Sequence, residues 1–129
     1  MKSSKVTDFG IGTAERTLAE YLEHWHNKNW AGMTKNSQLT WLKNEENPLK
    51  WIEDWHIHKH LKNYKVIKSQ KNSEVFVTVV VKCEIENNNK KLLANIQFNL
   101  IREKAPYKPD IEGVWGVNPI SGLKVTARS

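Results

Sequence analysis

Hydrophobic residues in the first part of the chain recur at helical spacing. Counted from residue 14, they fall four, seven, eight and eleven positions further on, which places them on one face of a helix. They are Ala14, Leu18, Tyr21, Leu22 and Trp25. Thr13 is a suitable N-cap, and Glu15 follows in the first turn, where the helix dipole favours a negative charge. The pattern predicts a helix from Thr13 to about Lys28.

Two further helix starts follow. Asn29 can cap a short helix within NWAGMTKNS. Asn47 followed by Pro48 is the clearest start in the chain. Proline lacks a backbone N–H, and at the first helical position that N–H would have no partner within the helix. Trp51 and Trp55 lie four residues apart and give this third helix an apolar side.

After residue 60 the hydrophobic period changes to two, which is typical of β-strands. We expect strands within residues 61–70, 74–86, 92–100 and 111–118. Alternate residues from Val75 to Ile85, and from Leu92 to Leu100, face the core. NNNK supplies the turn between these two strands, and the prolines of KAPYKPD exclude that segment from a sheet interior. Helices followed by a meander of antiparallel strands predict an α+β fold.

The composition fits one soluble domain. The chain has 129 residues, of which 39% are hydrophobic, and no apolar run approaches the ~18 residues that cross a bilayer, so no membrane contact is expected. The amino terminus lacks the apolar stretch of a signal peptide and Cys83 is the lone cysteine, so we expect a cytoplasmic protein without disulfides. The net charge of +6 is spread over scattered lysines, which favours a solvated surface over a nucleic-acid partner.

The order of these elements resembles the nuclear transport factor 2-like superfamily, and small prokaryotic members in particular. The features that carry the resemblance follow the first helix in the order NWAGM, LKNYKVIKSQ, SEVFVTVVVKCEIE, KKLLANIQFNLIRE and GVWGV. It implies an α-α-α-β-β-β-β cone, in which the helices pack in the concave face of a strongly curved antiparallel sheet. A cystatin-like or other helix-on-sheet fold is the alternative. We expect a flexible arm over residues 1–12, one domain over 13–120 and a polar tail over 121–129.

The stretch WIEDWHIHKH carries three histidines that raise the question of a metal site. In an extended chain His56, His58 and His60 share one face, whereas in a helix only the first and last do. The helix-to-strand transition falls inside this stretch, so the geometry stays open. No further acidic ligand with suitable spacing follows, and we expect neither a metal nor another cofactor.

We expect a non-enzymatic domain that binds a small apolar ligand or a protein. The predicted ligand pocket is lined by Tyr21, Trp25, Trp51, Trp55 and Trp115. The alternative is an enzyme of the isomerase or dehydratase kind, which transfers a proton on a small apolar or carbonyl substrate inside the cone. For that reaction His58 is the candidate acid or base and Asp54 the candidate orienting group.

Asn95, Gln97 and Asn99 form a row of amides on the outer sheet face, which either borders a homodimer contact or is exposed to water; we expect the homodimer. The resemblance supports this prediction, because outer sheet faces often form dimers in that superfamily.

Overall fold

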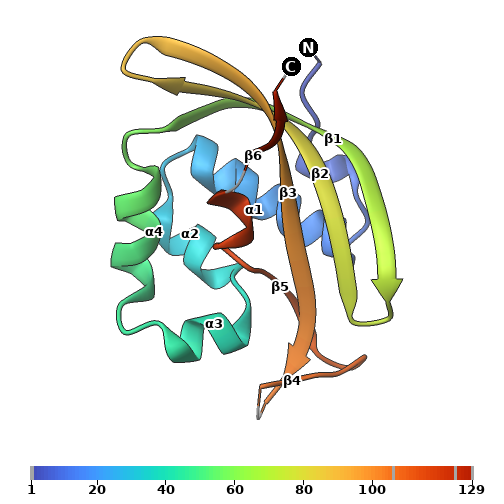
Figure 1. The fold of residues 1–129 in the computed structure, drawn as a ribbon. Coiled ribbons are helices and arrows are strands. Elements are labelled where there is room, and N and C mark those ends of the chain that lie inside the picture. Colours follow the sequence, from blue (N-terminus) through green and yellow to red (C-terminus); the bar gives the residue numbers. More distant parts are fainter. Residues whose placement is uncertain (1, 106, 124, 129) are drawn as a thin grey trace.

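The computed structural model describes residues 2–105, 107–123 and 125–128 (Figure 1). Its α-helices are α1 (Ala14–His26), α2 (Trp30–Lys35), α3 (Leu39–Asn44) and α4 (Pro48–His56), with short 3₁₀ turns η1 (Val6–Asp8) and η2 (Ser121–Leu123). Its strands are β1 (His60–Ser73), β2 (Phe76–Asn87), β3 (Lys90–Lys104), β4 (Lys108–Pro109), β5 (Val114–Val117) and β6 (Val125–Arg128). Residues 1–12 therefore include η1, and residues 121–129 include η2 and β6.

The strands form one antiparallel sheet that is organised around β3. One edge of β3 pairs with β2 along most of its length, and β2 in turn pairs with β1. The other edge of β3 pairs in succession with β6, β5 and β4. The expected α+β class with an antiparallel sheet is confirmed. The expected cone-like curvature is not confirmed. Within the described residues only β2 pairs with β1, and the sheet is open.

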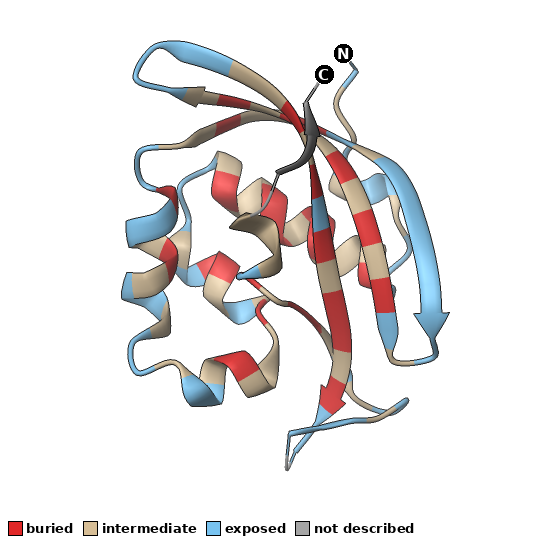
Figure 2. Ribbon diagram, in the orientation of Figure 1, coloured by how far each residue is buried: buried red, intermediate tan, exposed pale blue. Residues whose placement is uncertain are grey.

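Alternation along β2 and β3 builds the core, as the stripes of buried residues in Figure 2 show. The apolar face of α1 joins this core, and the ring of Tyr21 meets that of Phe98 edge-on with centroids 6.2 Å apart. Cys83 is buried in the same cluster, and burial raises the pKa of its thiol to about 12. The hydrophobic faces predicted for α1, β2 and β3 are thus those that the fold buries, whereas Trp55 on α4 and Ile111 before β5 are exposed.

Three of the four α-helices in the described residues begin at side-chain caps that the sequence predicts. The side chains of Thr13, Asn29 and Asn47 accept hydrogen bonds from backbone N–H groups in the first turns of α1, α2 and α4. The fourth helix, α3, was not predicted. The prediction of three helices is therefore wrong by one.

The start of α3 is held by a residue that is remote in sequence. The buried carboxylate of Glu103 on β3 accepts hydrogen bonds from the backbone N–H of Thr40 (3.1 Å) and from its hydroxyl (2.6 Å). Gln38, at the N-cap position, makes no side-chain capping bond. A helix that is capped through a 63-residue separation leaves no local signal in the sequence.

Replacing Glu103 tests this cap. Glu103→Ala removes both acceptors and leaves the amide of Thr40 without its partner, so we expect the free energy of unfolding to fall by about 2–3 kcal/mol. Glu103→Gln retains one acceptor and one donor, and we expect a smaller loss. Urea unfolding followed by circular dichroism measures both, with exposed Glu112→Ala as the matched control. Equal stability of the Glu103→Ala and Glu112→Ala variants would contradict the role of Glu103.

Candidate functional site

His56 is the histidine that the fold buries among aromatic rings. It occupies the last turn of α4 and is only 5% exposed. The ring of Trp25, in the last turn of α1, meets it edge-on with centroids 4.9 Å apart, and Trp30 stacks on it at 6.5 Å. The indole N–H of Trp25 donates to the backbone oxygen of Lys59 (2.8 Å), which fixes the Trp25 ring against the segment that follows α4.

The hydrogen bond that His56 makes determines its tautomer. Nδ1 lies 2.6 Å from the backbone oxygen of Ile52, which can only accept, so Nδ1 carries the hydrogen. Burial lowers the pKa of His56 to about 4; the bond to Ile52 opposes this shift and the charge of Lys59 adds to it. At neutral pH the ring is therefore uncharged and Nε2 is a hydrogen-bond acceptor. Nε2 has no hydrogen-bond partner among the described residues.

A cavity of about 110 Å³ adjoins His56, and we call it the His56 cavity. Its walls come from the ends of α1 and α4, from β2 and β3, and from η2. It is lined by Trp25, His56, Lys59, Ile85, Asn87, Leu92, Ile96, Gly122 and Leu123. Most of these side chains are apolar, so the cavity is mainly apolar, with the neutral imidazole of His56, the amine of Lys59 and the amide of Asn87 as its polar groups.

The structure does not bring the predicted catalytic pair together. His58 is exposed and lies beyond the end of α4. The carboxylate of Asp54 is exposed and pairs with Lys50 (2.7 Å). No hydrogen bond in the described part of the chain joins Asp54 to His58, and neither residue lines the His56 cavity.

The five predicted pocket residues are distributed over four places. Trp25 lines the His56 cavity. Tyr21 is fully buried in the core, where burial raises the pKa of its hydroxyl. The ring centroids of Trp51 and Trp55 on α4 lie 5.8 Å apart, and with Trp41 on α3 these rings form a partly exposed aromatic cluster. Trp115 lies on β5 under the guanidinium of Arg102.

The histidines do not converge as metal ligands. Within residues 2–105, 107–123 and 125–128 there is no group of three or more histidine, cysteine or acidic side chains that could hold a metal ion. His60 lies at the start of β1, with its ring 5.5 Å from that of His26. Burial, with the nearby charges of His26 and Lys28, lowers the pKa of His60.

The significance of His56 was missed by sequence reasoning, which chose His58. The signal that could have indicated it is its spacing of four residues from Ile52, on the buried side of α4.

None of the helices in the described residues is both long enough and apolar enough to span a membrane.

Comparison with known proteins gives a structural match only. No protein-family model matches this sequence, and no curated protein matches it either. The fold is similar to that of a SEC-C motif containing protein from Psychrobacter arcticus, with a TM-score of 0.65 and 14% identity. The match covers 94% of this chain and 64% of that protein, so the chain spans less than two thirds of its length.

This match corrects the family expected from the sequence. The prediction of a nuclear transport factor 2-like family is wrong, because the structural match is to a SEC-C motif containing protein. Helices followed by an antiparallel meander occur in more than one α+β family, and polarity patterns do not separate such families. At 14% identity the match concerns the fold alone.

The buried imidazole makes stability depend on pH. Unfolded His56 takes up a proton below about pH 6.5, whereas the folded protein resists protonation down to about pH 4. The free energy of unfolding should therefore fall as the pH is lowered through this window, by up to roughly 1.4 kcal/mol per pH unit. Above about pH 6.5 His56 is neutral in both the folded and the unfolded protein, so it causes no loss of stability there.

Urea unfolding at several pH values between about 4.5 and 7 measures this effect. His56→Asn is the informative variant, because its amide can still donate to the oxygen of Ile52 but cannot titrate. We expect the stability of this variant to decline less steeply with acid than that of the wild type. Parallel declines would show that other groups cause the pH dependence.

Proposed function

We propose that this domain binds a small, mainly apolar molecule in the His56 cavity, and that the ligand donates one hydrogen bond to Nε2 of His56. The observation that carries the proposal is an apolar cavity that has a neutral, oriented imidazole in its wall. A ligand hydroxyl or N–H would satisfy the acceptor that the protein leaves without a partner.

The size of the cavity limits the ligand. An apolar cavity of ~150 Å³ is known to hold a benzene molecule, and the His56 cavity is of the same order. The aliphatic walls formed by Ile85, Leu92 and Ile96 favour a compact ring or a short branched chain. A phenol-like molecule, with an apolar body and one donor, has the matching chemistry.

The properties of His56 favour binding over catalysis. A general base works best when its pKa lies near the working pH, and burial holds the pKa of His56 at about 4. The ring is also fixed by its bond to Ile52 and its contacts with two tryptophans. A fixed, neutral acceptor is suited to selecting ligands with a donor in one position.

Three expectations remain predictions from the sequence: the cone-like curvature of the sheet around the helices, the homodimer through the outer face of the sheet, and the expectation that nucleic acid is not a partner. Gel filtration with light scattering measures the oligomeric state of the chain and so tests the dimer directly.

Phenol and benzene form a probe pair that tests the proposal. They share a ring, but only phenol can donate a hydrogen bond. We expect phenol to bind about fivefold more tightly than benzene, because a net hydrogen bond contributes about 1 kcal/mol. Ligand-observed NMR together with shifts of the Trp25 indole signal measures both affinities and locates the probe.

Two variants separate the roles of the imidazole and the cavity. His56→Asn should abolish the preference for phenol, while exposed His58→Ala should leave it unchanged. Leu92→Trp should block both probes by filling the cavity. Failure of both probes to bind at millimolar concentration, or a phenol preference that survives His56→Asn, would overturn the proposal.

A further inference from the structure

A second hollow, of about 250 Å³, lies at the other end of α1, and we call it the Arg102 hollow. It is more open than the His56 cavity and shares no residue with it. It is lined by Gly12, Thr13, Ala14, Glu15, Lys71, Ser73, Glu74, Val77, Arg102 and Trp115. These residues come from the start of α1, the β1–β2 hairpin, β3 and β5.

Arg102 is held in place at several points. Its Nε–H donates to the backbone oxygen of Gly113 (3.1 Å), and its backbone N–H donates to the backbone oxygen of Val75 (2.9 Å). The guanidinium carbon lies 5.8 Å from the centre of the Trp115 ring. The two terminal nitrogens have no hydrogen-bond partner among the described residues. The protein therefore orients a planar fork of donors and leaves its outer edge unused.

The acidic side chains that line the hollow interact with residues other than Arg102. Glu74 forms an ion pair with Lys71 (2.8 Å), and the carboxylate of Glu15 accepts a hydrogen bond from the hydroxyl of Ser69. The hydrogen bond and charge of Lys71 lower the pKa of Glu74, and Arg102 adds to this only through its charge. No carboxylate of the described residues pairs directly with Arg102.

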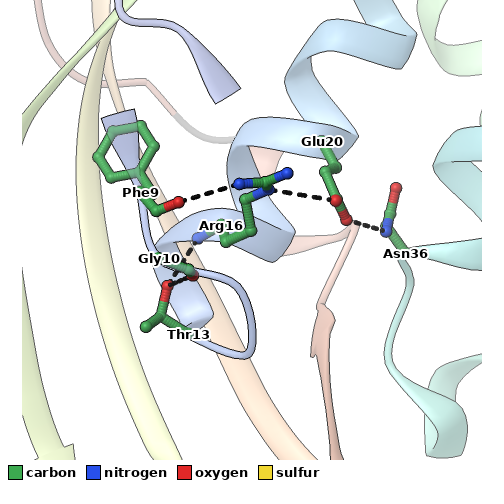
Figure 3. A network of polar contacts seen from close by, with 6 residues as sticks. All are labelled: Phe9, Gly10, Thr13, Arg16, Glu20 and Asn36. Carbon is green, nitrogen blue, oxygen red and sulfur yellow. Dashed lines mark hydrogen bonds and ion pairs between the residues drawn. The ribbon is translucent and has the colours of Figure 1, made fainter. Parts of the chain in front are cut away.

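Gly12 and Thr13, which line the hollow, belong to a turn before α1 that hydrogen bonds of the protein itself hold in place (Figure 3). The hydroxyl of Thr13 donates to the oxygen of Gly10 (2.7 Å) and accepts from the backbone N–H of Arg16 (3.2 Å). Arg16 in turn donates from Nη1 to the oxygen of Phe9 (3.1 Å). Gly12 adopts a φ of 85°, which favours glycine at this turn. The wall beside Thr13 thus has its shape before any ligand binds.

The arrangement indicates the chemistry of a ligand. A guanidinium whose outer edge is unused matches a carboxylate, which can accept both N–H groups at once. The ring of Trp115 and the side chain of Val77 offer an apolar surface beside that fork. Glu15 on the same wall repels a doubly charged phosphate more strongly than a singly charged carboxylate, whereas Lys71, which also lines the hollow, offsets the charge of Glu74.

From this geometry we infer a second ligand site: the Arg102 hollow binds small monocarboxylates that carry an apolar or aromatic group. The carboxylate bonds to the terminal nitrogens of Arg102, and the apolar group lies against Trp115 and Val77. The site is independent of the His56 cavity and does not rest on the function proposed for that cavity.

NMR titration of the full chain with phenylacetate tests this site, in a buffer without phosphate, sulfate or carboxylate. We expect saturable shifts of the Arg102 Nε–H and Trp115 indole N–H signals. Phenylacetamide has the same shape but no charge, and we expect it to bind about tenfold more weakly, the loss of a charge-assisted bidentate contact. Because this comparison uses the wild-type protein, it holds even where a variant fails to fold.

Variants assign the effect to Arg102. Arg102→Gln should weaken phenylacetate binding about tenfold, and Arg102→Lys, which keeps the charge but loses the fork, should also weaken it. Exposed Lys68→Gln removes the same charge elsewhere and should change the affinity less than about twofold. Equal binding of phenylacetate and phenylacetamide, equal losses in Arg102→Gln and Lys68→Gln, or absence of saturable shifts at Arg102 would overturn the inference.

Discussion

Backbone pairing on both edges of β3 holds this fold together. The strand pairs with β2 on one side and with three short strands on the other, so the chain after β3 returns to it three times. Its inward residues supply a large part of the core, and its end supplies the carboxylate that caps α3. It also places its residues at two separate sites, since Ile96 lines the His56 cavity and Arg102 the hollow at the opposite end of α1.

Local features of the fold could be predicted from the sequence, and features set by tertiary contact could not. Thr13, Asn29 and Asn47 cap helices within their own turns, so a short sequence window contains the whole interaction. The cap of α3 depends on Glu103, which only the folded sheet brings near. The family assignment failed for a related reason, because alternation and helical period describe elements and not the way in which they are connected in space.

The candidate sites show the same division. The sequence indicated that the end of α4 is chemically unusual, but the choice between His56 and His58 depends on where the helix ends and which side the core covers. Arg102 carried no signal at all, because an arginine on an alternating strand is ordinary until Trp115 and Gly113 are packed against it. In both cases the chemistry comes from the surroundings that the fold supplies and not from the residue type.

The burial of Cys83 has a practical consequence. Only the thiolate reacts readily with alkylating and oxidising reagents, and a thiol with a pKa of about 12 inside the core forms almost none of it at neutral pH. Since the chain has a single cysteine, modification of the native protein requires the core around Cys83 to open. The rate at which a thiol reagent modifies Cys83 therefore reports how often the core opens, and no cysteine has to be introduced for the measurement.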